Sequence, residues 1–111
     1  MNDWKYCHAE NTTDINGNPS GGFVAGEGLS IHWQEGALGR GTDRKPANGA
    51  FVETVLTAAK QRLEFYQEAS GGKFACNENA LAIDAINVAL HWLEVRTEKR
   101  EERKVEGTHT A

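Results

Sequence analysis

Two runs of apolar residues at helical spacing, separated by Ser70-Gly71-Gly72-Lys73, constrain this chain more than any other feature. In the first run, the apolar positions recur every three or four residues, which places them on one face of a helix. They are Val52, Val55, Leu56, Ala59, Leu63 and Tyr66. The glycine pair then allows the backbone to reverse tightly. The sequence therefore predicts a long antiparallel helical hairpin over residues 50–106.

The second run carries two apolar stripes, which a single partner helix cannot cover together because helix contacts are narrow seams. The first stripe consists of Ile83, Ile86, Leu90 and Leu93, and the second of Leu81, Ala85, Val88, Trp92 and Val95. The second stripe needs another surface, either the rest of the chain or a second copy. Because leaving several large apolar side chains in water is costly, we expect a homo-oligomer.

Composition narrows the class of protein. At 111 residues, the chain has the length of one domain. Its 12 basic and 16 acidic residues give a formal charge of −4, the wrong sign for a duplex nucleic-acid binder. The absence of a run of about 18 apolar residues argues against a membrane span. The polar start lacks a secretory signal, and Cys7 and Cys76 lack metal-site spacing, so we expect free thiols in a cytoplasmic protein.

The N-terminal half has two parts. Residues 1–28 are rich in Asn, Thr, Asp, Gly and Ser and predict a polar arm. Its two aromatic residues, Trp4 and Tyr6, leave open whether the arm lies on another surface or is a mobile tail. Residues 29–49 begin with alternating apolar positions typical of a short strand. The predicted fold class is therefore α+β and mainly helical: the hairpin plus a short N-terminal strand and glycine-loop element.

The segment after the predicted strand combines glycines with cations. Gly36, Gly39 and Gly41 let the backbone approach a ligand closely, and Arg40 and Arg44 add positive charge. The P-loop pattern does not fit, because Thr and Asp stand where Lys and Ser/Thr are required. Two interpretations remain: a loop that binds an anion, or an ordinary surface turn.

The ends of the two helices also suggest functions. Asn48 and Asn77 are expected to cap the first and second helix. Near the end of the second helix, a cationic row follows Trp92, and it consists of Arg96, Lys99, Arg100 and Arg103. An aromatic ring beside such a row suits a base and its phosphates. The alternative is a solvated helix end whose cations complement the helix dipole. Residues 107–111 are expected to form a polar tail.

No pattern of catalytic or metal-binding residues is apparent. The four histidines, His8, His32, His91 and His109, are scattered rather than set at metal-ligand spacing. Neither a nucleophile elbow nor a paired-carboxylate motif occurs. We therefore expect a protein without enzymatic activity, catalytic residues, metal or cofactor.

The second helical run, Glu78 to Trp92, resembles the hairpin domain of phage anti-Thoeris and anti-CBASS sponge proteins in its order of Glu, Ala, aliphatic residues and Trp. Residues 48–53 and 105–109 also look like segments of small phage and prophage proteins. The resemblance covers the hairpin, about half of the chain, and does not extend to residues 21–44. It implies an oligomer that sequesters a nucleotide immune signal between protomers without cleaving it, in the cytoplasm of an infected bacterium. The signals of that family are cyclic ADP-ribose variants and cyclic di- or trinucleotides.

Residue chemistry, rather than the resemblance, supplies the candidate contacts. The expected ligand-binding residues are Trp33, Gly39, Arg40, Gly41, Arg44, Trp92, Arg96, Arg100, Arg103, Thr108 and His109. The arginines would hold phosphate or ribose oxygens, a tryptophan would stack on the base, and Thr108 or His109 would close over the ligand. Two other functions are kept as alternatives: an oligomeric helical-hairpin module that binds proteins, and a small nucleotide-cleaving enzyme.

Overall fold

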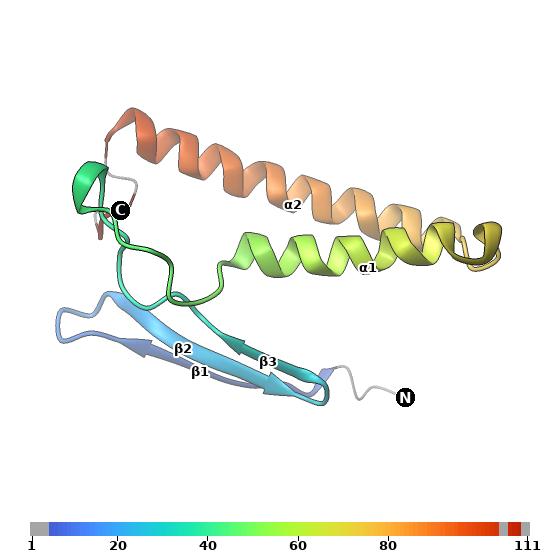
Figure 1. The fold of residues 1–111 in the computed structure, drawn as a ribbon, viewed down its shortest axis with the longest axis horizontal. Coiled ribbons are helices and arrows are strands. Elements are labelled where there is room, and N and C mark those ends of the chain that lie inside the picture. The colour runs from blue at the N-terminus through green and yellow to red at the C-terminus, as the bar shows by residue number, and fades with distance from the viewer. Residues whose placement is uncertain (1–4, 105–106, 110–111) are drawn as a thin grey trace. The chain divides into compact units, whose positions relative to one another are not determined.

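The structure is a computed structural model that describes residues 5–104 and 107–109. Its elements in chain order are β1 (His8–Thr13), β2 (Pro19–Gly26), β3 (Leu29–His32), η2 (Gly41–Asp43), α1 (Val52–Gly72) and α2 (Asn77–Glu102) (Figure 1). A three-stranded antiparallel sheet and two helices confirm the α+β class. The chain divides into two compact units. One unit contains the residues up to Phe51 and those from Lys104 onward, and the other spans Val52–Arg103.

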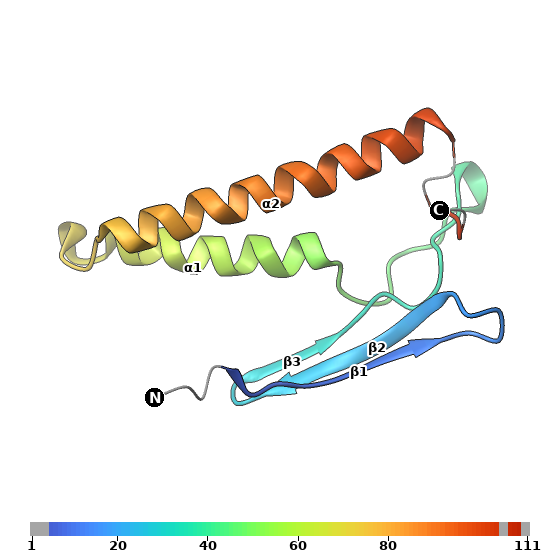
Figure 2. The same ribbon diagram turned by 180° about the vertical axis from the view of Figure 1, so that it is seen from behind.

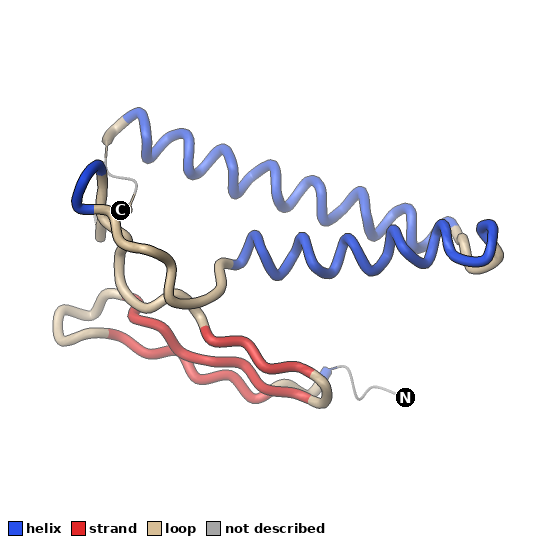
Figure 3. The backbone as a smooth tube through the Cα atoms, viewed as in Figure 1, coloured by secondary structure: helices blue, strands red, loops and turns tan. Residues whose placement is uncertain are grey.

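The first unit contains a sheet of order β1-β2-β3, drawn in red in Figure 3. This corrects the expected polar arm, because β1 and β2 occupy most of residues 8–26. The strands β1 and β2 are connected by a tight turn. In it, the Asp14 carboxylate accepts hydrogen bonds from the backbone N–H groups of Asn16 and Asn18 at 2.9 and 3.0 Å. Every residue of β1 is exposed, so backbone pairing to β2, rather than burial of side chains, forms this strand.

One element boundary, the start of β3, falls where the sequence pattern changes. β3 begins at Leu29, where the alternating pattern starts. Tyr6 is 76% exposed, whereas Trp4 lies outside the described residues. Residues 105–106 of the predicted hairpin and 110–111 of the predicted tail also lie outside them. The helical part begins at Val52 and ends at Glu102, inside the predicted range of 50–106.

The second unit is the antiparallel pair α1 and α2, which run side by side in both Figure 1 and Figure 2. The reversal occurs where the sequence predicts it, because Ala69, Ser70 and Gly71 leave helical backbone geometry. The side chain of Gln67 closes this end of the hairpin. Its Oε1 accepts from the N–H of Cys76 at 3.0 Å, and its Nε2 donates to the Cys76 carbonyl at 3.1 Å.

Both predicted helix caps are wrong. Cys76, not Asn77, is the N-cap of α2, since its backbone is extended and its Sγ accepts from the N–H of Asn79 at 3.4 Å. Asn77 is already the first helical residue. Asn48 lies four residues before α1 and is used in the preceding loop: its Oδ1 accepts from the N–H of Glu35 at 2.8 Å.

Three polar contacts join α1 to α2 along the length of the hairpin. Glu53, Lys60 and Gln67 supply them from α1 and are seven residues apart, two helical turns, so they lie on one side of the helix. Their partners on α2 are Arg96 at 3.9 Å, Asn87 at 3.1 Å and the backbone of Cys76. These repeated contacts fix which face of α1 meets α2.

Burial separates the two apolar stripes of α2. Ile83, Ile86, Leu90 and Leu93 of the first stripe are half-buried. In the second stripe, Leu81, Val88 and Trp92 remain 58%, 56% and 63% exposed. None of the residues that the structure describes is fully buried. In the same part of the chain, no helix has the length and apolar character that spanning a lipid bilayer requires.

Candidate functional site

The glycine loop that follows β3 is closed by backbone hydrogen bonds at two levels. At its base, Ala50 N–H donates to the His32 carbonyl at 2.7 Å, and Gln34 N–H donates to the Ala50 carbonyl at 2.9 Å. Nearer its tip, Lys45 N–H donates to the Leu38 carbonyl at 2.7 Å. Because the loop is held by its own backbone, its conformation does not depend on side-chain burial.

Arg40 and Arg44 lie at the tip of this closed loop. They are the residues immediately before and after η2, whose first residue is Gly41. Asp43 N–H donates to the Arg40 carbonyl at 3.1 Å, and Arg44 N–H to the Gly41 carbonyl at 3.3 Å. Arg40 is half-buried and Arg44 is exposed. The two cations are therefore carried by a single short turn.

Trp33 belongs to the base of the loop rather than to its tip. Its N–H donates to the Gly22 carbonyl at 3.0 Å, and it forms an isolated parallel bridge with Ala50. The backbone of Gly49 packs so closely on Trp33 that a side chain at position 49 would overlap the Trp33 carbonyl. Trp33 is half-buried, and its backbone anchors the loop to the sheet.

The C-terminal segment lies against the same loop. Gly39 N–H donates to the Gly107 carbonyl at 2.6 Å, and the segment runs beside η2 in both ribbon views (Figures 1 and 2). Thr108, the next residue, is half-buried, and His109 is exposed. The N–H of Gly39, one of the donors that the sequence assigned to a ligand, is thus occupied by the chain itself.

Asp14 lies in the turn between β1 and β2. The pKa of its carboxyl lies below the ordinary value of 3.8, chiefly because the backbone N–H of Asn18 donates to it. An electrostatic interaction with His109 contributes a smaller lowering of the same pKa.

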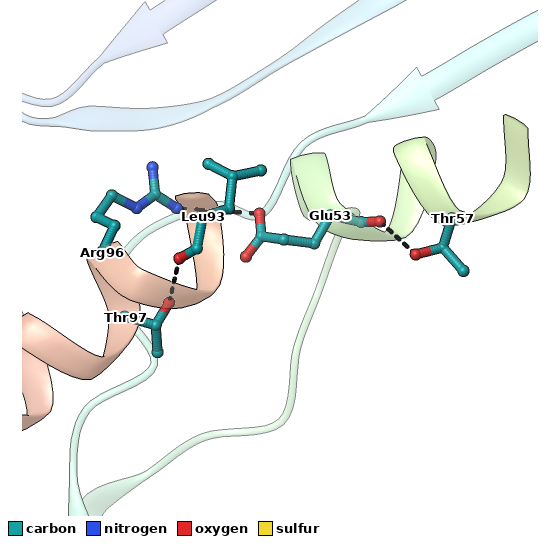
Figure 4. A network of polar contacts seen from close by, with 5 residues as sticks. All are labelled: Glu53, Thr57, Leu93, Arg96 and Thr97. Carbon is teal, nitrogen blue, oxygen red and sulfur yellow. Dashed lines mark hydrogen bonds and ion pairs between the residues drawn. The ribbon is translucent and has the colours of Figure 1, made fainter. Parts of the chain in front are cut away.

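The second group of candidates lies on α2. Trp92 is 63% exposed, with its ring edge-on to His91 at a centroid distance of 5.1 Å. Arg96 forms an ion pair with Glu53 at 3.9 Å (Figure 4). Arg100 is half-buried, and Arg103 is the C-cap of the helix. Because its partners are largely solvated, the Arg96 pair contributes little to stability.

Acidic residues occupy a different side of the same helix end. An open hollow is lined by Glu94, Thr97, Glu98, Glu101 and Glu102. At 100° per residue, Glu94, Glu98 and Glu101 point roughly opposite to the cationic row. Charge is therefore segregated around α2, and an anion would meet attraction on one face and repulsion on the other.

The structure brings some of the predicted residues together. Gly39, Arg40, Gly41 and Arg44 form one loop, and Thr108 and His109 adjoin it through Gly107. Trp33 holds the base of that loop. Trp92, Arg96, Arg100 and Arg103 belong to the other unit. Sequence reasoning missed the contact that Gly107 makes with Gly39, and it assigned Asn48 to a helix cap rather than to the loop.

Comparison with known proteins gives two similarities. The profile of a family described as "Acb2/Tad1, hairpin domain" matches residues 34–98, which include the glycine loop, α1 and most of α2. A curated protein named Thoeris anti-defense 1, from Bacillus phage SBSphiJ7, is 40% identical over 85 residues. The match covers 77% of this chain and 55% of the phage protein, so the chain spans about half the length of that relative.

Proposed function

The chain belongs to the Acb2/Tad1 hairpin-domain family, and from this we propose that it is a phage anti-defence protein. Its activity is to bind a nucleotide immune signal, a cyclic ADP-ribose variant or a cyclic oligonucleotide, and to sequester it without cleaving it in the cytoplasm of the infected cell. The observation that carries the proposal is the family match over residues 34–98, which the relative named Thoeris anti-defense 1 supports.

The cationic residues supply the chemistry for holding the ligand. Arg40 and Arg44, carried by one turn, suit the two oxygens of a phosphate, because a guanidinium donates two parallel hydrogen bonds. Arg96, Arg100 and Arg103 hold further phosphate or ribose oxygens, and exposed Trp92 stacks on a base. Gly41 and Trp33 support the loop, and Thr108 and His109 close beside it. Truncating one arginine of a desolvated pair costs about 2–5 kcal/mol, whereas the same arginine in solvent contributes little.

Self-association supplies the dry environment that such pairs need. Leu81, Val88 and Trp92 are more than half exposed, and no described residue is fully buried. A second copy of the chain covers this stripe and excludes water from neighbouring cations. The proposed protein is therefore a homo-oligomer that binds its ligand at a subunit boundary.

The same exposed stripe favours a second function, a hairpin module that oligomerises and docks another protein. A nucleotide panel distinguishes the two functions, because a ligand that binds only the native state raises the melting temperature by mass action. The panel contains cyclic ADP-ribose, cyclic di-AMP and a cyclic trinucleotide, with AMP as the linear control. A protein-binding module would be stabilised by none of them.

Arginine variants then test the assigned contacts. Arg40→Ala and Arg100→Ala should each weaken nucleotide binding more than tenfold. A combined loss that departs from a simple sum would show that the two arginines share one ligand. Arg62→Ala is the matched control, because it removes an arginine that is not assigned to the ligand. The Cζ atom of Arg62 lies 5.0 Å from the ring centroids of Phe65 and Tyr66 on α1. The bound nucleotide should be recovered intact after heat denaturation. A cleaved product, or full binding by the double variant, would contradict the proposal.

A further inference from the structure

Gly39 and Gly107 meet backbone to backbone, and the contact leaves no space for a side chain. The Gly39 N–H donates to the Gly107 carbonyl at 2.6 Å. A Cβ on Gly107 would overlap the carbonyl oxygen of Gly39, and a Cβ on Gly39 would lie 2.8 Å from the Asp43 carbonyl oxygen. Both residues also have positive φ, +87° and +82°, which side chains strongly disfavour. Two independent constraints, space and backbone conformation, therefore require glycine at both positions.

This junction determines where the following residues lie. Thr108 is half-buried directly after it, and His109, which is exposed, follows. On the other side of the junction, Gly39 is followed at once by Arg40. The backbone of Gly107 thus ties the C-terminal segment to the residue that precedes a phosphate-binding candidate.

We propose that Gly107 is a positioning residue: by docking on Gly39 it holds Thr108 and His109 beside Arg40 and Arg44, where they close one side of the nucleotide site. This inference rests on the proposed function. Gly107 itself offers a nucleotide no side chain, so its effect on binding passes through the residues that it positions.

Gly28, in the turn between β2 and β3, provides a matched control. Its φ is +74°, close to that of Gly107, but a Cβ there would meet nothing within 4 Å. Gly28→Ala therefore introduces the same kind of backbone strain without the overlap. The difference between Gly107→Ala and Gly28→Ala isolates the contact with Gly39.

Amide hydrogen exchange tests the docking without any ligand. In Gly107→Ala, exchange of the Gly39 N–H should become about tenfold faster. This factor corresponds to the loss of one hydrogen bond whose net contribution to stability lies near the upper end of the usual range. The Lys45 N–H, which donates to the Leu38 carbonyl within the loop, should be unchanged and reports that the loop stays folded. Gly28→Ala should leave the Gly39 rate unchanged. An unaltered Gly39 rate in Gly107→Ala would overturn the inference.

Calorimetry with cyclic ADP-ribose and with cyclic di-AMP tests the role in binding. Gly107→Ala should weaken binding at least tenfold, and Gly28→Ala less than threefold. His109→Ala should weaken binding in the parent chain but add less than twofold in the Gly107→Ala background, because the histidine is already displaced there. A purely structural role for Gly107 would leave the effect of His109→Ala the same in both backgrounds and would overturn the inference.

The outcomes also separate this inference from the proposed function. If the parent binds nucleotide and Gly107→Ala binds equally well, the positioning role is refuted and the proposed function stands. A second outcome is that the parent binds neither nucleotide while Gly107→Ala still accelerates exchange of the Gly39 N–H. The contact of Gly107 with Gly39 would then exist without a role in binding these nucleotides, and the inference would be refuted. If Gly107→Ala fails to fold, nucleotide binding by His109→Ala provides the test. Normal binding by that variant would contradict the proposal that Thr108 and His109 close one side of the site.

Discussion

The second apolar stripe of α2 leads to a quantitative prediction for Leu81→Ala combined with Val88→Ala. Burial of each methyl or methylene group is worth about 0.8 kcal/mol. Leu81 is 58% exposed and Val88 is 56% exposed, so more than half of the surface of each residue remains to be buried by a partner. The groups removed would have contributed about 2 kcal/mol from each copy, and about 4 kcal/mol across an interface that uses both copies. If the partner covers only half of the exposed area, the total falls to about 2 kcal/mol.

These free energies correspond to an increase in the dissociation constant of between about thirtyfold and about a thousandfold. Sedimentation equilibrium over a dilution series measures the constant directly. Because both side chains are largely exposed in the single chain, the free energy of unfolding of the dissociated protein should change little, as measured by urea titration at low concentration.

Ile86→Ala provides the opposite control. Ile86 is half-buried and belongs to the first stripe of α2, so its truncation should lower the free energy of unfolding of the single chain. Its effect on the dissociation constant should stay below threefold. Unchanged self-association of the Leu81→Ala/Val88→Ala variant would refute the reasoning, as would a parent chain that is monomeric at micromolar concentration.

Four further predictions concern local contacts. Gln67→Ala should lower the free energy of unfolding by about 1 kcal/mol in a urea titration, because two hydrogen bonds to Cys76 are lost. Cys76→Ser should raise the melting temperature, because a hydroxyl is a better N-cap acceptor than a thiol. Since the pKa of Asp14 is lowered in the folded state, its stabilising effect is full above the ordinary value of 3.8 and is lost as the pH falls through the lower native value. Asp14→Asn should therefore be less stable than the parent at about pH 6, and the difference should shrink as the pH falls below 3.8. Thiol labelling without reductant should count both Cys7 and Cys76, which are exposed and unbridged, in the native protein.

The helical hairpin could be predicted from the sequence because its determinants are local. Spacing of three and four residues defines a helix face, and Gly71-Gly72 marks the reversal. The sequence also separated a stripe that packs within the hairpin from one that does not. The sheet could not be predicted in this way, because β1 is exposed at every position and so carries no alternating pattern. Its pairing with β2 depends on backbone groups that every sequence has.

The candidate site could likewise be predicted only where its residues are neighbours in the sequence. Arg40 and Arg44 could be grouped from the sequence because they are neighbours in one glycine loop. The contact of Gly39 with Gly107 could not, since it joins backbone atoms far apart in the chain and leaves no side-chain signature. Asn48 was misassigned for a related reason: an asparagine suits a helix cap and a loop brace equally well, and only the position of α1 decides between them.

The junction of Gly39 with Gly107 has a consequence for the order in which the chain folds. All of α1 and α2 lies between these two residues, so a nascent chain has synthesised the whole hairpin before Gly107 exists. Ordering the hairpin first shortens the loop that the junction must close, because the hairpin folds back on itself and Arg96 Nη2 then lies 3.9 Å from Oε1 of Glu53, in the first turn of α1. In refolding followed by pulsed amide exchange, protection of the Lys60 and Asn87 amides should therefore precede protection of Gly39. The residues that position the candidate site should accordingly be ordered late.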